Sequence, residues 1–202
     1  MSTSELSVSD PSAALRERPK RADARRNYDK VVAAARQAFG ERGASTSLED
    51  IARRAGVGIG TLYRHFPTRQ ALLEAVYLDE VESLSRSAAE FAGLPPWEGL
   101  VGWLHRFVDY LATKQALAEQ MLEYMDRSAP FFQGCRTLMY AAGEPLLARA
   151  QAAGVVRPDI DFPEITQMVM GISRLPSAEP DAVKHILDIA LDGLRYRPPD
   201  QS

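Results

Sequence analysis

Residues 48–66 read LEDIARRAGVGIGTLYRHF, and this stretch predicts two short helices joined by a tight turn. Ser47 can cap the first helix, because Asp50 follows three residues later and side chains in that pattern satisfy the unpaired amide groups of a first turn. Thr46 with Glu49 offers the same pattern one residue earlier, so both starts remain open. Either start predicts a short helix directly before the turn.

A glycine and a proline delimit the second helix. Gly56 can take the left-handed conformation that closes the first helix near Ala55. The next helix is expected at Ile59–His65, because Pro67 stops it and Thr68 can cap a further helix. We expect four apolar side chains to pack a three-helix core: Ile51, Val57, Leu62 and Phe66. Others are left to face outward on a helix thin enough for the major groove of DNA: Gly58, Gly60, Thr61, Tyr63, Arg64 and His65.

Helical spacing of apolar residues dominates the whole chain, and alternating β-branched runs are lacking, so the predicted class is all-α. We expect a disordered arm at 1–18, a three-helix helix-turn-helix domain at 19–70 and a C-terminal helical domain at 71–202. Gly93, Pro95 and Pro96 mark a loop inside the second domain. The other helices are expected at about Asn27–Arg42, Trp97–Ala112, Lys114–Asp126, Phe132–Ala152, Pro163–Ser173 and Asp181–Arg195.

The charge changes sign along the chain. Residues 16–70 hold 13 Lys and Arg against 6 Asp and Glu, a formal charge of +7. The remainder holds 11 basic against 21 acidic residues and carries −10, within a net −3 for all 202 residues. A basic module joined to an acidic body is typical of a nucleic-acid binder with a separate interaction domain, and basic stretches are also often solvated helix faces.

Several other classes of site find little support. A lone Cys135 excludes an internal disulfide framework and favours a cytoplasmic compartment. His105 and His185 have no ligand partners at metal-binding spacing, and no catalytic triad is suggested. The glycines of residues 56–60 lack the spacing of a phosphate-binding loop. We therefore expect no cofactor, no metal, no catalytic residue, no secretion signal and no membrane segment.

Residues 21–76 resemble the DNA-binding domain of the tetracycline-repressor (TetR) family in order and spacing. The resemblance lies in Ala33-Ala34-Ala35 to Phe39 and Gly43, in Thr46 to Gly56, and in Gly60-Thr61-Leu62-Tyr63-x-His65-Phe66. It implies that Thr61 and Tyr63 touch phosphates or base edges, and that His65 reaches a phosphate. It also implies that Thr46 or Ser47 holds the DNA backbone on the other side.

Two positions depart from the commonest family pattern. Many members carry Ser where Gly58 stands and Lys where Arg69 stands, although Arg69 can still contact a phosphate. Base readout is therefore expected to rest more on Ile59, Thr61 and Arg64 than on Gly58. Three arginines at the start of the first helix can reach phosphates or the minor groove, and solvated charges are the alternative: Arg21, Arg25 and Arg26.

The C-terminal part, residues 97–171, is similar to the SbtR-like subgroup, a similarity that names no ligand. Aromatic and sulfur-bearing side chains at helical spacing fit either a pocket for an apolar ligand or an ordinary core. The pocket candidates are Trp103, Phe107, Tyr110, Met121, Tyr124, Met125, Phe132 and Met139. The family dimerises through its last two helices, which implies an interface formed by Ile165, Met168, Ile172, Val183, Ile186, Leu187, Ala190 and Leu194.

These features together predict a ligand-responsive DNA-binding transcriptional regulator. We expect a homodimer that binds a palindromic operator and a small-molecule effector, as a repressor that leaves the operator when the effector binds. A regulator that activates transcription would use the same DNA-binding and C-terminal domains, so activation is the alternative to repression. A helical protein–protein adaptor whose basic end binds acidic partners and a small-molecule enzyme in the C-terminal domain are the rival interpretations.

Overall fold

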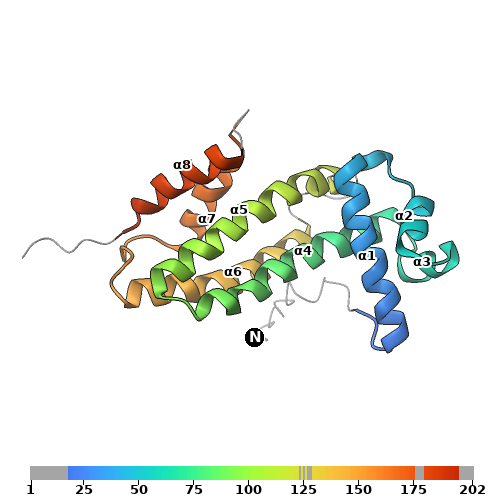
Figure 1. Ribbon diagram of the computed structural model, residues 1–202, viewed down its shortest axis with the longest axis horizontal. Coiled ribbons are helices and arrows are strands. Elements are labelled where there is room, and N and C mark those ends of the chain that lie inside the picture. Colours follow the sequence, from blue (N-terminus) through green and yellow to red (C-terminus); the bar gives the residue numbers. More distant parts are fainter. Residues whose placement is uncertain (1–17, 123, 125, 127–128, 176–179, 196–202) are drawn as a thin grey trace, which may run out of the picture. The chain divides into compact units, whose positions relative to one another are not determined.

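The computed structural model describes residues 18–122, 124, 126, 129–175 and 180–195. Within these residues the elements are helices (Figure 1), and one isolated antiparallel bridge joins Val156 to Arg195. The all-α prediction is therefore confirmed. In chain order the elements are α1 (Ala22–Arg42), the 3₁₀ turn η2 (Gly43–Ser45), α2 (Leu48–Ala55), α3 (Ile59–His65), α4 (Arg69–Ala92), α5 (Pro96–Met121), α6 (Pro130–Ala152), α7 (Phe162–Ile172) and α8 (Pro180–Asp192).

The chain folds into two compact units. Unit 1 comprises residues 1–78 and 120–138, and unit 2 comprises residues 79–119 and 139–202. The long helices α4, α5 and α6 each contribute to both units, so the division does not follow a single point in the sequence. The segment 19–70 lies wholly in unit 1, where α1, α2 and α3 pack against one another and are called the head below.

The head is held together by the apolar stripe predicted for its first helix. Val31, Ala35 and Phe39 of α1 are fully buried and meet the equally buried Leu62 and Phe66 around α3. Val57 is only half-buried. Burial of such side chains contributes about 1.5–3 kcal/mol each, which explains how a short helix such as α3 is held in place.

Both predicted helix boundaries around the turn are confirmed. The backbone N–H of Asp50 donates to the Ser47 Oγ at 3.1 Å, so Ser47 rather than Thr46 is the cap of α2. Gly56 adopts the left-handed conformation, with φ 66° and ψ 32°, and ends the helix. The first helix is longer than expected, because it starts at Ala22 rather than near Asn27.

In the C-terminal half one prediction is wrong. Residues 97–126 were expected to form two helices that break near Thr113, whereas α5 is a single helix from Pro96 to Met121. Neither glycine nor proline interrupts the sequence there, and the buried Leu111 and Leu117 continue the apolar face through the expected break.

Aromatic stacking forms the core of unit 2. The Trp103 ring lies 5.8 Å from both the Phe107 and the Phe162 ring, and Tyr140 meets Phe162 edge-on at 5.4 Å. The Trp103 indole N–H donates to the Leu84 carbonyl at 3.3 Å, which satisfies its buried polar group. The core is therefore both dense and hydrogen-bonded.

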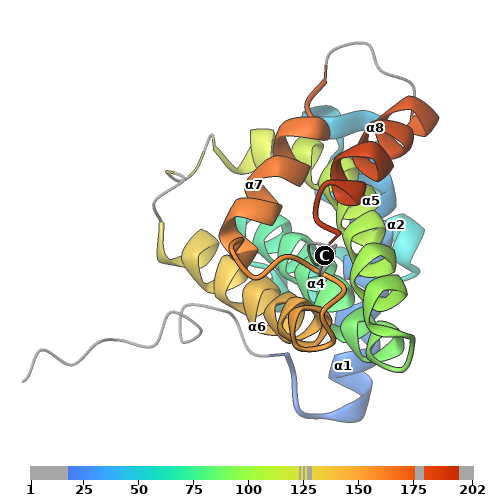
Figure 2. The same ribbon diagram turned by 90° about the vertical axis from the view of Figure 1, so that its left-hand side faces the viewer.

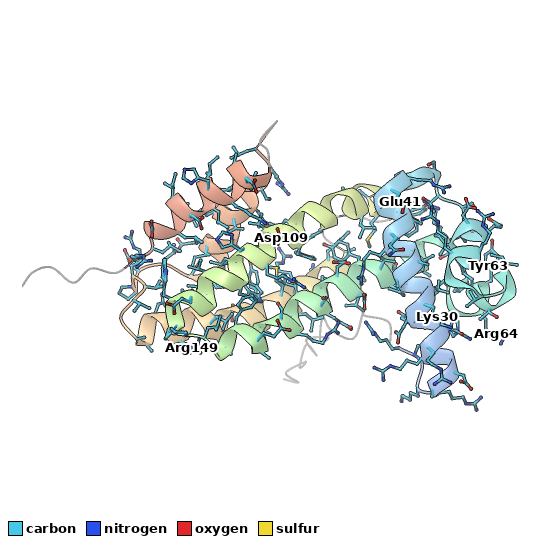
Figure 3. The ribbon with its side chains drawn as sticks, viewed as in Figure 1. Lys30, Glu41, Tyr63, Arg64, Asp109 and Arg149 are labelled. Atoms are coloured by element: carbon cyan, nitrogen blue, oxygen red, sulfur yellow. The ribbon has the colours of Figure 1, made fainter. Side chains whose placement is uncertain are left out.

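Helix ends in unit 2 are fixed by polar groups. Asp161 and Glu164 form a reciprocal capping box at the start of α7. Arg149 of α6 (Figure 3) donates to the carbonyl oxygens at the end of α4, to Phe91 at 3.3 Å, to Leu94 at 2.9 Å and to Ala92. These bonds satisfy carbonyls that a helix end leaves without partners.

Helix α8 is attached to its neighbours by packing and by charge. It packs against α7 (Figure 2). His105 of α5 pairs with Asp188 at 2.7 Å, and Asp109 of α5 pairs with Lys184 at 3.3 Å. Both pairs are partly exposed, so the buried Leu187 contributes more to the attachment than these two polar contacts do.

Candidate nucleic-acid interface

Helix α3 presents two different faces. Leu62 on the inner face is fully buried and Phe66 follows it into the core. Ile59 and Tyr63 on the outer face are 39% and 45% exposed, and Arg64 is also exposed. Tyr63 and Arg64 both lie at the surface of the head (Figure 3). The outer face therefore offers an aromatic hydroxyl, an aliphatic side chain and a cation to a partner.

The two remaining polar residues of α3 lie closer to the body of the head. Thr61 and His65 are half-buried. The His65 ring meets the Tyr28 ring of α1 edge-on at 6.2 Å, and Tyr28 also packs on Phe66 at 4.9 Å. The histidine is thus positioned by α1, with part of its ring at the surface.

Exposed cations on α1 extend this surface. Arg25 lies three residues before Tyr28, so the two share a helix face, and Arg21 stands directly before the first residue of α1. Within the described residues the side chains of Arg21, Arg25, Lys30 and Arg64 make no ion pair.

Other arginines of the head are engaged with acidic groups. Arg54 pairs with Glu41 at 2.7 Å, and Arg42 and Arg53 both pair with Asp50. Arg26 pairs with Asp23 on its own helix. The uncompensated positive charge of the head therefore gathers on the outer face of α3 and the amino-terminal half of α1, where phosphates are attracted most strongly.

Two of the predicted DNA contacts are engaged inside the head. The side chain of Thr46 is 2% exposed and its hydroxyl donates to the Ala38 carbonyl at 2.8 Å, so it joins α1 to the start of α2. Arg69 is half-buried and donates to the carbonyls of Gly43 and Thr46, with its guanidinium 5.0 Å from the Phe39 ring centre. It fastens the loop before α2. Ser47 is exposed.

The predicted pocket residues fall into three groups. Trp103, Phe107, Tyr110 and Met139 are buried in unit 2. In unit 1, Met121 is fully buried, Phe132 is half-buried against Tyr77, and Tyr124 is exposed. Met125 lies outside the described residues. A pocket role and a core role are both compatible with these burials.

The predicted dimer residues also divide. Ile165, Leu187 and Leu194 are buried within the subunit, so they belong to its own core rather than to a surface. The surface of α7 and α8 carries the others, which are half-buried or exposed: Met168, Ile172, Val183, Ile186 and Ala190. Sequence spacing missed Ile189, the most exposed large apolar side chain of the described residues at 61%. A helical wheel with Leu187 and Leu191 inward would have indicated it.

Two other kinds of site are absent from the part of the chain that the structure describes. It contains no group of three or more His, Cys, Asp or Glu side chains able to hold a metal ion. None of its helices is long and apolar enough to cross a membrane.

A short helix with an exposed polar face, preceded by a tight glycine turn and a capped helix, defines a helix-turn-helix DNA-binding domain. Residues 31–76 match the family described as "Bacterial regulatory proteins, tetR family", and residues 95–196 match "Transcriptional regulator SbtR-like, C-terminal domain". The chain belongs to the TetR family of transcriptional regulators, which are DNA-binding proteins and not enzymes.

Individual relatives agree with this membership. The TetR transcriptional regulator SCO0520 of Streptomyces coelicolor is 41% identical, and the match covers 84% of this chain and 98% of that one with a TM-score of 0.70. A TetR transcription regulatory protein of Mycobacterium vanbaalenii is 34% identical over 88% and 99% of the two chains, with a TM-score of 0.72.

A curated relative matches the N-terminal part. The HTH-type transcriptional regulator UidR of Escherichia coli K12 is 36% identical over 83 residues, which are 41% of this chain. The match spans 37% of the length of UidR, well under half.

Proposed function

We propose that this regulator binds a roughly palindromic operator as a homodimer, represses transcription from it, and leaves it when a small-molecule effector binds. The observation that carries the DNA-binding part is the outer face of α3. Tyr63 and Arg64 are exposed there, and within the described residues Arg64 has no ion-pair partner, in a head whose α2 cations are compensated by acids.

In this proposal α3 lies in the major groove. Arg64 contacts a base edge or a phosphate, and Tyr63 donates its hydroxyl to a phosphate. Arg25 reaches the DNA backbone from α1, and Ser47 approaches it from the start of α2. Thr61 and His65, which are half-buried, hold the backbone at close range.

The dimer is proposed to form through α7 and α8. Exposed apolar side chains support this, because Ile186 is 37% and Ile189 is 61% exposed on α8, and Leu175 follows α7 at 40%. Contiguous exposed apolar surface on a helix pair favours association with a second copy. A two-fold axis then places two α3 helices on successive turns of the major groove.

The effector is proposed to be a small, largely apolar molecule recognised among the aromatic side chains. Its binding shifts the population toward a spacing of the two heads that no longer fits the operator. The hydroxyls of the buried Thr166 and the half-buried Tyr140, which lie 3.2 Å apart, are polar groups able to orient such a guest. Repression is the direction proposed, because a dimer on an operator blocks polymerase by bulk alone.

The DNA-binding proposal is tested by the affinity of the full-length protein for its own upstream intergenic duplex against a scrambled duplex at fixed salt. Tyr63→Ala and Arg64→Ala should each lower the specific affinity by on the order of 10- to 100-fold. The matched control is Arg106→Ala, an exposed arginine of unit 2 without an ion-pair partner in the described residues.

Preference for the native duplex by orders of magnitude, lost in the two α3 variants and retained in the control, supports the proposal. Equal weak binding to both duplexes contradicts it and favours the adaptor interpretation. Dimer formation is tested separately by sedimentation of Ile189→Glu, which should dissociate, against Leu94→Glu, another exposed apolar position, in the loop after α4. A dimer unaffected by Ile189→Glu places the interface elsewhere.

A further inference from the structure

Two glycines of the recognition helix have no role in the fold. Gly58 precedes α3 with φ −67° and ψ 145°, a conformation open to any residue. Among the described residues, positive φ occurs at Gly43, Gly56 and Gly154, and Gly60 is not among them. A Cβ atom added at Gly58 or Gly60 would meet nothing within 4 Å. Neither backbone strain nor packing therefore requires glycine at these positions.

Glycine at position 60 is unfavourable for the helix itself. Glycine weakens a helix interior by about 1 kcal/mol relative to alanine, and α3 has only seven residues. Gly58 is the N-cap of α3, a position that tolerates glycine well, and it offers no side chain there. The two glycines together leave room for a surface outside the chain to approach the backbone closely.

Between the two glycines stands the first residue of α3, Ile59. It is 39% exposed and lies four residues before Tyr63, so both side chains are on one face of the helix. Arg64 lies five residues after Ile59, so its side chain points about 140° away from that of Ile59 around the helix axis. Ile59 is therefore separated from the Arg64 guanidinium, and the glycines on either side of it carry no side chain.

The edges of base pairs in the major groove offer one apolar group to such a side chain. This group is the 5-methyl of thymine, and the other groups are hydrogen-bond donors and acceptors that an isoleucine can only desolvate. The amino-terminal turn of the recognition helix is the part of a helix-turn-helix that reaches base edges. An aliphatic side chain there gains contact with a thymine and loses hydration at any other base.

We propose that Ile59 reads the 5-methyl group of one thymine in each half-site, and that Gly58 and Gly60 leave the room that this contact needs. The inference rests on the proposed operator binding and specifies its chemistry. It assigns to Ile59 a role in sequence specificity that is distinct from the phosphate and base contacts of Tyr63 and Arg64.

The test uses the full-length protein and a binding site selected from a random duplex library. Each thymine of the selected site is replaced in turn by deoxyuridine, which keeps the base pair and removes only the methyl. One symmetric position should lose affinity about fourfold in one half-site and on the order of 15-fold in both, the effect of one methyl group.

The pairing of residue with base is tested by repeating the replacement with variants. Ile59→Ala should bind the thymine and uracil duplexes equally at that position, whereas Ile59→Val should retain part of the difference. Leu94→Ala, an exposed apolar position outside the head, should retain the full loss. Because Ile59 is surface-exposed, thermal denaturation should show each variant folded.

Three results would overturn the inference in distinguishable ways. An equal uracil penalty in the native protein and in Ile59→Ala means that another residue reads the methyl. Unchanged affinity at every thymine replaced by deoxyuridine means that the protein reads no 5-methyl group. A protein that selects no site at all contradicts the proposed operator binding itself and removes the inference with it.

Discussion

Two glycines of unit 2, Gly102 and Gly143, contrast with the two glycines at the start of α3, Gly58 and Gly60. A Cβ at Gly102 would lie 2.6 Å from the Phe91 ring, and one at Gly143 would lie 2.8 Å from Trp103 and closer still to Phe162. A Cβ at Gly58 or Gly60 would meet open space. Gly102 and Gly143 are required by neighbours inside the chain, whereas Gly58 and Gly60 leave open space at the surface of the head.

The arginines show the same contrast. Arg149 and Arg69 give their guanidinium groups to backbone carbonyls and so fasten helix ends and loops. Arg64 and Arg25 leave theirs exposed. The same residue type therefore serves structure where carbonyls converge and stays exposed, available for the proposed DNA contacts, where they do not.

The largest effect on stability is expected for Gly143→Ala in α6. The added methyl overlaps the Phe162 and Trp103 rings, so the free energy of unfolding should fall by about 3 kcal/mol. Urea denaturation followed by tryptophan fluorescence measures it. Gly40→Ala is the matched control, because Gly40 lies in α1 with open space around it and alanine there should be neutral or stabilising. Equal losses in the two variants would refute the packing role of Gly143.

The opposite behaviour is expected of Gly60→Ala. Operator affinity should fall by on the order of 30-fold, because two half-sites each lose close approach. The free energy of unfolding should stay the same or rise by up to about 1 kcal/mol. Fluorescence anisotropy with the operator duplex and thermal denaturation give the two numbers. Unchanged affinity would show that DNA does not approach the backbone at Gly60.

Thr46→Val tests whether the Thr46 hydroxyl stabilises the head or contacts DNA. It leaves the Ala38 carbonyl without its buried partner and should lower the free energy of unfolding by about 1–2 kcal/mol. The folded variant should bind operator normally, since the hydroxyl does not face DNA. Ser45→Ala removes an exposed hydroxyl and serves as the comparison. A loss of operator affinity without a loss of stability would mean that Thr46 contacts DNA.

The smallest effect is expected for Asp188→Asn, which weakens the pair with His105 between α5 and α8. Both groups are partly exposed, so the free energy of unfolding should fall by no more than about 0.5 kcal/mol, and by less at 1 M salt. Denaturation at low and high salt provides the measurement. A drop of several kcal/mol would mean that charge, rather than the buried Leu187, attaches α8.

The head was predictable because its signals are local. Ser47, Gly56 and Pro67 act on the residues beside them, and the spacing of Val31, Ala35 and Phe39 marks one helix face without knowledge of any other helix. The single helix α5 was not predictable in the same way. Its apolar face continues over 26 residues, so no local signal shows whether one helix or two consecutive helices form there.

The candidate site was only partly predictable for a related reason. The sequence placed Tyr63 and Arg64 on the outer face of a short helix, but residue type alone could not separate Ser47, at the surface, from Thr46, in the interior. A threonine hydroxyl reaches either a phosphate or a carbonyl. The choice depends on the end of α1, eight residues earlier in sequence.

The sequence by itself determined the all-α class, the turn between the two short helices and the basic charge of the N-terminal region, because composition, caps and periodicity are properties of neighbouring residues. The tertiary structure alone decided which cations remain uncompensated, which apolar residues of α7 and α8 stay at the surface, and which glycines have room for a side chain. Each of these depends on atoms that are distant in sequence, and distance in space is fixed only when the helices pack.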